Sequence, residues 1–339
     1  MKPFVSLICP IYNEEKHIEK CVESLLAQDY PRDRMEILFV DGMSADRTRE
    51  ILDAFQAKYA FIRMFDNPGR TAPYALNIGI GVSQGEVVMR VDAHSAYPPD
   101  YVSRLAESLI RLGADNVGGL WNTLPAADTP VCRAIAVASS HVFGVGLSVH
   151  KVGADKVRQV DTVPFGCFRR EVFDRVGLFD TELTRNQDDE FNGRIIKNGG
   201  RIYLIPSVRI DYTARDTIGK AARMYYQYGL FKPLVNKKLG APATLRQFFP
   251  ALFVLGIVAG AVWSIFSPVI LWIYLGVWFL YLLLGVSFGV REAGRLKDWR
   301  LVFSLPCVFF VIHTAYGLGY WKGLYNVLFR RPFRAGSNR

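Results

Sequence analysis

The stretch Glu86-Val-Val-Met-Arg-Val-Asp-Ala-His-Ser95 decides how the rest of the chain is interpreted. The apolar residues before Asp92 are typical of a buried strand, and Asp92 and His94 follow where that strand runs into a proline-rich loop. Alternation in an extended segment turns both side chains to one face, so they can share a ligand. The pair therefore predicts a site for a divalent cation.

Strands and helices alternate on the N-terminal side of this stretch. Strands are predicted over 4–9, 36–40 and 61–65, and helices over 13–27, 46–55 and 72–80. This order implies an α/β fold, a mostly parallel sheet flanked by helices, in which ligands bind beyond the carboxyl ends of the strands. Polar residues fall at those ends: Tyr12, Asn13, Asp41, Ser44, Asn67, Arg70, Asp92 and His94.

The sequence contains neither G-x-G-x-x-G nor G-x-x-x-x-G-K-[ST]. The absence of both motifs argues against a dinucleotide-binding fold and against an ATPase-type phosphate loop. A nucleotide bound here must therefore be held by side chains.

The C-terminal part has a different composition. Half of the 339 residues are apolar, and from Phe248 onward they concentrate in runs over 248–266, 269–288 and 301–320, each about long enough to cross a bilayer. The third run carries His313 and several glycines that weaken a regular helix, so two alternatives stay open for it: a third span, or a helix partly in the membrane interface. We expect an α/β domain over 1–215, a basic and aromatic interfacial helix over 216–247, a membrane region over 248–329 and a basic tail over 330–339.

The formal charge of +10 does not indicate nucleic-acid binding, because no Lys/Arg run interleaved with aromatics occurs in the first two hundred residues. The basic residues instead flank the apolar runs, as in cytoplasmic loops facing anionic lipid. Five scattered cysteines without metal-site spacing indicate a reducing compartment. The apolar core near the N-terminus is too short for a signal peptide. We therefore expect a multi-pass protein of the inner (plasma) membrane with its large domain in the cytoplasm.

An acidic cluster, Asp188-Asp-Glu190, opens a further predicted helix. The helix dipole keeps carboxylates at this position ionised, which suits a general base or a metal ligand. The cluster could also simply cap the helix.

Taken together, the motifs resemble family 2 glycosyltransferases of the inverting, GT-A type. The closest resemblance is to membrane-bound enzymes that elongate lipid-linked exopolysaccharide units, as in succinoglycan synthesis. The matching motifs occur in the family's order between about residues 3 and 210: Cys9-Pro-Ile-Tyr-Asn-Glu14, Val40-Asp-Gly-Met-Ser-Ala-Asp46, Asn67-Pro-Gly-Arg70, Val91-Asp-Ala-His94, Gly166-Cys-Phe-Arg-Arg-Glu171 and Gln187-Asp-Asp-Glu190.

The resemblance implies roles for individual residues. Those implied to bind the nucleotide sugar are Pro10, Tyr12, Glu14, Asp41, Arg70, Asn77 and Asp92. Asp92 and His94 would hold Mn²⁺ or Mg²⁺, with His94 in place of the second acid of the family's D-x-D motif; imidazole accepts Mn²⁺ more readily than Mg²⁺. Asp188 would be the general base, with Asp189 as the alternative. Those implied to contact the acceptor are Gly166, Cys167, Phe168 and Arg169, and Arg223 or Lys232 could contact the diphosphate.

The implied activity is metal-dependent, inverting hexosyl transfer from a nucleotide-diphosphate sugar to a lipid-linked (polyprenyl diphosphate) saccharide. The helix around residues 223–232 lacks the Q-x-x-R-W motif of processive synthases, so one sugar per encounter is expected. Two alternatives stay open: transfer directly to polyprenyl phosphate, and a non-catalytic membrane protein that senses a nucleotide sugar.

Overall fold

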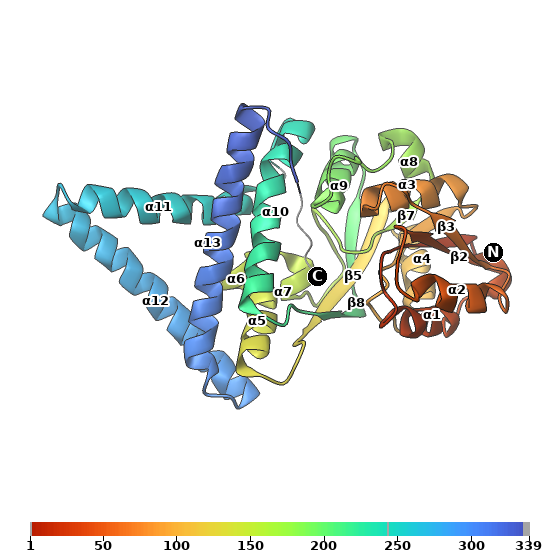
Figure 1. The fold of residues 1–339 in the computed structure, drawn as a ribbon, viewed down its shortest axis with the longest axis horizontal. Coiled ribbons are helices and arrows are strands. Elements are labelled where there is room, and N and C mark those ends of the chain that lie inside the picture. Colours follow the sequence, from red (N-terminus) through yellow and green to blue (C-terminus); the bar gives the residue numbers. More distant parts are fainter. Residues whose placement is uncertain (1, 243, 335–339) are drawn as a thin grey trace. The chain divides into compact units, whose positions relative to one another are not determined.

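A computed structural model of the chain describes residues 2–242 and 244–334. The chain folds into two compact units (Figure 1). The first contains the residues up to Asn122 together with Gly153–Tyr212, and the second contains Thr123–Val152 and the residues from Thr213 onward. Residues 123–152, which the sequence analysis assigned to the first domain, thus pack with the C-terminal helices.

The first unit is built on one eight-stranded mixed sheet. Its strands, in spatial order, are β3 (Ile62–Asp66), β2 (Met35–Asp41), β1 (Val5–Ile11), β4 (Val87–Arg90), β7 (Cys167–Arg169), β5 (Asn116–Leu124), β8 (Ile202–Thr213) and β6 (Arg158–Gln159). The first four run parallel, as the alternation of strands and helices predicts. β7 runs antiparallel to both β4 and β5, and β6 runs antiparallel to β8.

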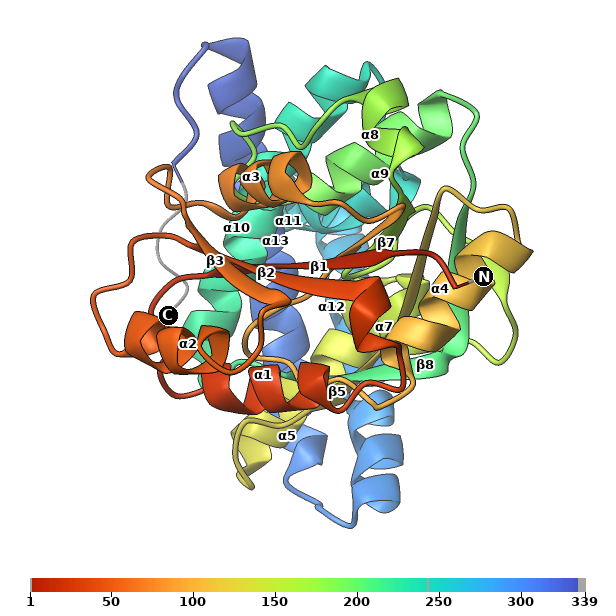
Figure 2. The ribbon, with the colours of Figure 1, turned by 90° about the vertical axis from the view of Figure 1, so that its right-hand side faces the viewer.

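Helices cover both faces of this sheet (Figure 2). One face carries α1 (Ile18–Leu26), α2 (Thr48–Gln56) and α4 (Tyr101–Arg111); the other carries α3 (Ala72–Val82), α8 (Glu171–Val176) and α9 (Gln187–Lys197). α1 buries Ile18, Val22 and Leu25, a helical spacing that puts them on one stripe against the strands. The predicted α/β fold with flanking helices is confirmed.

The second unit is helical. It contains α5 (Pro130–Ser140), α6 (Val142–Val145), α7 (Val149–Val152), α10 (Ile218–Leu239), α11 (Phe249–Ser264), α12 (Pro268–Leu296) and α13 (Leu301–Leu328). Three helices, Leu245–Ser264, Pro268–Leu296 and Leu301–Leu328, are long and apolar enough to cross a membrane. The predicted C-terminal helical region is therefore confirmed.

α5 belongs to this unit because its apolar face matches that of α13. Ala134, Ile135 and Ala138 are buried in one cluster with Leu305 and Phe309. At one end of this contact an ion pair joins Arg133 Nη1 to Asp298 Oδ2 at 2.7 Å.

The glycines of the third apolar run act as packing sites rather than as breaks in the helix. α13 is continuous from Leu301 to Leu328, and a Cβ at Gly319 would lie 2.1 Å from the carbonyl oxygen of Tyr226 on α10. A Cβ at Gly323 would lie equally close to the carbonyl of Leu230. Small residues four apart let two helix backbones approach closely. The cost of glycine in the helix is therefore offset by contact with α10.

Candidate active site

The loops after β1 and β2 are joined by hydrogen bonds. Asn13, at φ 53°, donates its backbone N–H to Ser44 Oγ at 2.8 Å, and its Oδ1 accepts from the N–H of Ala45 at 2.8 Å. The N–H of Glu14 donates to Thr48 Oγ1 at 2.7 Å. These bonds fix the loop that carries Tyr12 and Glu14, and Pro10 lies just before it at the end of β1; all three are predicted to bind the nucleotide sugar. Tyr12 is 38% exposed there.

Asp41 and Arg70, also predicted to bind the donor, differ in exposure. The Asp41 side chain is fully buried and accepts hydrogen bonds from Ser44 Oγ at 2.5 Å and Arg49 Nη1 at 2.7 Å. Arg49 also pairs with Asp66 at 2.8 Å, so Asp41 ties β2 to α2 and β3. Arg70 is exposed, and its backbone lies in the left-handed region at φ 54°. Contact of either residue with a nucleoside stays a prediction.

Asp92 and His94 lie together, as the alternation of side chains predicts. The His94 Nδ1 is 3.0 Å from Asp92 Oδ1 and 3.7 Å from Glu14 Oε1. Two contacts hold this loop: the N–H of Asp92 donates to Tyr97 Oη at 2.6 Å, and Ala96 forms an antiparallel bridge with Asp211. A buried carboxylate, a partly exposed carboxylate and an imidazole thus meet at the end of β4.

This donor set is chemically suited to a divalent ion. Carboxylate oxygen and imidazole nitrogen together suit ions of the Mn²⁺ class. Among residues 2–242 and 244–334, no group of three His, Cys, Asp or Glu side chains is arranged to hold a metal ion. The chain would therefore supply two ligands, Asp92 and His94, and a diphosphate or water the others.

Asp188 is brought to the same edge of the sheet by an ion pair. It lies in the first turn of α9, after Asn186 at φ 59°. Arg90 Nη1 contacts Asp188 Oδ1 at 2.6 Å and Oδ2 at 2.5 Å, and the two side chains are 12% and 34% exposed. Because Arg90 ends β4 two residues before Asp92, the predicted base and the predicted metal ligands belong to one site.

The electrostatics of this ion pair favour a basic carboxylate. Burial raises the pKa of Asp188, Arg90 lowers it, and nearby Asp189 and Asp92 raise it, which leaves the pKa above its ordinary value. Burial lowers the pKa of Arg90, but Asp188 and Asp92 outweigh burial, so Arg90 stays charged. An ionised carboxylate of raised pKa accepts a proton more readily than an ordinary one.

Buried polar contacts fix the position of α9. Arg194 pairs with Glu190 at 2.7 Å one turn earlier and donates to the carbonyl of Leu178 at 2.7 Å. On the other side, Asn192 accepts from Asn116 and donates to Thr162, both at 2.8 Å. Both sets of bonds hold the helix turn that carries Asp188.

An aromatic stack continues from Arg90. Phe165, in the left-handed region at φ 47°, places its ring 5.7 Å from the Arg90 guanidinium. Trp121 lies 6.0 Å from Phe165 and stacks on Tyr212 at 4.2 Å and 7°. A bulky residue at positive φ is strained, and such strain is typical of functional sites. Sequence reasoning missed Arg90 and this stack; the available signal was one arginine within an otherwise apolar strand.

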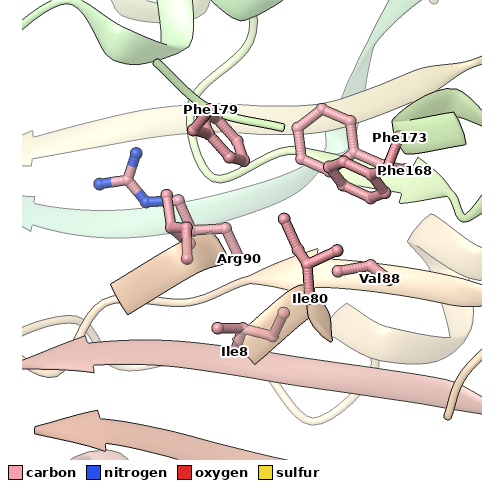
Figure 3. Close-up of a pocket in the computed structure, with 8 residues that line it drawn as sticks. Ile8, Ile80, Val88, Arg90, Phe168, Phe173 and Phe179 are labelled. Atoms are coloured by element: carbon pink, nitrogen blue, oxygen red, sulfur yellow. The ribbon is translucent and has the colours of Figure 1, made fainter. Parts of the chain in front are cut away.

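The predicted acceptor residues line the interior of the first unit. Cys167 and Phe168 are buried, and Arg169 Nε donates to the carbonyl of Ala114 at 2.9 Å. Gly166 is crowded by the Phe168 ring. A cavity beside Phe168 has room for about one water molecule, too little for a sugar (Figure 3). Its lining residues are Ile8, Leu76, Ile80, Val88, Arg90, Phe168, Phe173 and Phe179. Contact of residues 166–169 with an acceptor stays a prediction.

The remaining predicted residues lie as follows. The side-chain amide of Asn77 donates to the carbonyl of Phe179 at 2.8 Å and accepts from the N–H of Phe179 at 2.9 Å. Asn77 thus joins α3 to the segment before α9. Asp189 follows Asp188 in the first turn of α9. Arg223 and Lys232 lie on α10 in the second unit. None of these positions tests the predicted role.

Known proteins resemble the chain along nearly its whole length. A dolichyl N-acetyl-alpha-D-glucosaminyl phosphate 3-beta-D-2,3-diacetamido-2,3-dideoxy-beta-D-glucuronosyltransferase of Methanococcus voltae is 27% identical over 329 residues, 95% of this chain and 97% of that protein. The succinoglycan biosynthesis protein ExoA of Rhizobium meliloti is 29% identical over 328 residues, 96% of each chain.

Solved structures share the fold at lower identity. A mannosyltransferase of Pyrobaculum calidifontis, solved with GDP-Man and Mn²⁺, superposes with a TM-score of 0.60 at 18% identity and covers 96% of this chain and 88% of its own. S. aureus TarS 1-349, solved with UDP-GlcNAc, gives 0.51 at 16% identity and 90% coverage of both chains. The family description "Glycosyl transferase family 2" matches residues 6–176. The chain belongs to glycosyl transferase family 2.

Proposed function

We propose that this protein is an inverting glycosyltransferase that moves one sugar from a nucleotide-diphosphate sugar to a lipid-linked saccharide in exopolysaccharide or related glycan synthesis. The observation that carries the proposal is the contact of Arg90 with both oxygens of Asp188. Through this contact a carboxylate of raised pKa lies beside the Asp92–His94 pair, so a base and a cation site are available to one sugar.

The names of related proteins support the substrate classes. The Methanococcus voltae relative is named as acting on a dolichyl-phosphate-linked sugar, which favours a lipid-linked saccharide over free polyprenyl phosphate. Two proteins of the same fold are named in complex with GDP-Man and UDP-GlcNAc, which favours a nucleotide-diphosphate sugar as donor. Three apolar helices and the basic residues that flank them support a multi-pass membrane protein with its catalytic unit in the cytoplasm.

In the proposed mechanism Asp188 takes the proton of the acceptor hydroxyl as its oxygen attacks C1 of the donor sugar. A new C1–O bond forms on the side opposite the diphosphate, the old C1–O bond breaks, and its electron pair leaves with the nucleoside diphosphate. Asp92 and His94 would hold a divalent ion, which supplies positive charge to the leaving diphosphate. Arg90 holds Asp188 in place and keeps it ionised until the acceptor arrives.

The test is the pair of variants Asp188→Asn and Asp189→Asn, assayed in detergent with a panel of nucleotide sugars and lipid-linked acceptors. Asp188→Asn should lose at least about a hundredfold in kcat, the range of general base catalysis, while it still binds donor. Asp189→Asn, which changes the same charge one residue away, should keep most of its activity. Normal turnover by Asp188→Asn would show that Asp188 is not the base. If Asp189 is the base instead, Asp189→Asn should lose activity and Asp188→Asn should keep it.

Product analysis tests the acceptor class and the stereochemistry. Attack by a sugar hydroxyl gives an acid-stable glycoside of inverted anomeric configuration, whereas attack by polyprenyl phosphate gives an acid-labile phosphodiester. An acid-labile product, or retained configuration, would contradict the proposal. A protein that binds nucleotide sugar but forms no product with any acceptor would instead be the sensor.

A further inference from the structure

The helical hairpin of α11 and α12 is the most apolar part of the second unit. The sequence has no charged residue between Arg246 and Arg291, and the turn at Ile265–Ser267 is flanked by exposed apolar side chains. Ile265, Phe266 and Trp272 are 78%, 75% and 73% exposed. Helices satisfy their own backbone hydrogen bonds, so such a hairpin can enter hydrocarbon.

The two legs of the hairpin contact α13 at positions far apart along that helix. The start of α11 contacts the later part of α13: Trp321 Nε1 donates to the carbonyl of Ala251 at 2.9 Å, and a Cβ at Gly317 would lie 2.2 Å from the carbonyl of Pro250. The end of α12 contacts the beginning of α13, where a Cβ at Gly289 would lie 3.0 Å from the carbonyl of Leu301.

Leu301 and Gly317 are separated by about 24 Å along the axis of α13, at roughly 1.5 Å per residue. α13 therefore lies across the open base of the V formed by α11 and α12 (Figure 1).

Basic residues mark both ends of the V. Arg246 precedes α11, and Arg291 and Arg295 lie in the last turns of α12. Arginines that flank apolar helices lie at the cytoplasmic membrane surface, where lipid headgroups are anionic. Both ends of the V are thus at one depth, and a helix that joins them runs along the surface rather than across the bilayer.

α10 gives an independent reason for the same orientation. Its backbone touches that of α13, since a Cβ at Gly229 would lie 2.0 Å from the carbonyl of Tyr316. α10 is a charged helix that carries Lys220, Arg223, Lys232, Lys237 and Lys238. Arg223 precedes Gly229 and Lys232 follows it on α10, and such side chains in the middle of a helix are costly in hydrocarbon. This cost disfavours depth in the bilayer for α10 and for the part of α13 that packs on it.

We propose that α13 and α10 lie in the plane of the membrane interface on an anionic lipid surface, and that only the α11–α12 hairpin enters the hydrocarbon. Exposed apolar side chains of α13, such as Phe303 and Leu328 at 67% and 68%, face the acyl chains. It follows from this proposal that residues 330–334, with Arg330, Arg331 and Arg334, lie on the same side of the membrane as the first unit.

Cysteine accessibility tests the side of the membrane. The full-length chain with Cys307→Ser retains Cys9, Cys21, Cys132 and Cys167, which are all buried. Two variants of this chain are made, one with Arg334→Cys in the tail and one with Glu107→Cys on α4; both positions are exposed. Sealed vesicles of each orientation are treated with a membrane-impermeant maleimide. The two cysteines should react in vesicles of the same orientation, and reaction in opposite orientations would overturn the proposal.

Depth measurements test the orientation of α13 itself. Nitroxide labels replace Phe303, Phe310, Leu318 or Tyr325, all exposed, and their collisions with oxygen and with a nickel chelate are compared in vesicles containing anionic lipid. Labels along an in-plane helix should give one similar shallow depth, whereas a maximum of depth in mid-helix would overturn the proposal. Spin–spin broadening without lipid contact would mean that a second copy of the chain covers this face, and would also overturn it. Neither readout requires activity, so the outcome is independent of the proposed transferase reaction.

Discussion

Replacing Arg90 with glutamine removes the guanidinium that bonds both oxygens of Asp188 and leaves a shorter, uncharged polar side chain. Loss of one partner costs about 3–5 kcal/mol in a fully buried ion pair and about 0–1 kcal/mol in an exposed pair. Here the side chains are 12% and 34% exposed. We therefore expect a loss of about 1–3 kcal/mol in the free energy of unfolding when Asp188 is ionised.

The sign of the pH dependence follows from the pKa of Asp188. Burial already raises this pKa above its ordinary value and Arg90 opposes burial, so the pKa rises further without Arg90. A carboxyl whose pKa is higher in the folded protein loses stability as pH rises through that pKa. The deficit of Arg90→Gln should therefore be small at acid pH, where the carboxyl is protonated, and complete at higher pH.

Activity should depend on pH in the opposite sense, with its largest deficit at acid pH. Because the base must be ionised, the acid limb of kcat/KM should shift to higher pH in Arg90→Gln. Below that limb, a loss of 1–3 kcal/mol corresponds to about 5- to 150-fold in rate. The measurement is kcat/KM against pH in detergent, with unfolding followed over the same pH range. Arg90→Lys, which keeps a positive charge, should restore part of the shift.

Arg194→Gln is the matched control, because it breaks the pair with Glu190 on the same helix. It should lower stability but leave the acid limb in place. An acid limb in Arg90→Gln identical to that of the unmodified protein would refute the idea that Arg90 sets the pKa of the base. An equal shift in Arg194→Gln would show that general loosening of α9 is the cause.

Two further predictions concern the metal site and the helix packing. Chelation should abolish transfer and Mn²⁺ should restore it; full activity in excess chelator would contradict this. His94→Asp should move the metal preference towards Mg²⁺, because an oxygen ligand replaces imidazole. Both are measured as transfer rate against the concentration of each metal. Gly319→Ala should lower the free energy of unfolding by about 1–3 kcal/mol, because the new Cβ meets the carbonyl of Tyr226. Gly276→Ala, with nothing within 4 Å of its Cβ, should have little effect, and equal thermal shifts in detergent would contradict the packing argument.

The parallel half of the sheet is predictable because its signals are local. β1 and β2 are apolar runs ended by polar loops, and each is followed by a helix whose apolar residues recur at helical spacing. The closeness of Asp92 and His94 follows from strand alternation alone.

The other half depends on contacts between distant parts of the chain. β7 has three residues and lies between β4 and β5, which are separated from it by long stretches of sequence. No periodicity reveals such a pairing, and the same is true of Arg90 with Asp188 and of Asn77 with Phe179. The glycines of α13 misled the sequence analysis because helix propensity does not include a partner helix.

The interrupted layout of the second unit has a consequence for biosynthesis. α5 leaves the ribosome long before α13, its packing partner, and the strands β7 and β8 that complete the sheet are made in between. Until α13 emerges, the apolar face with Ala134, Ile135 and Ala138 is covered only in part, by residues of α10 such as Met224. Exposed apolar surface on an unfinished chain attracts chaperones and favours aggregation. We therefore expect chains cut before Leu301 to be cleared by cellular proteases even though their sheet is complete, so that only full-length protein accumulates in the membrane.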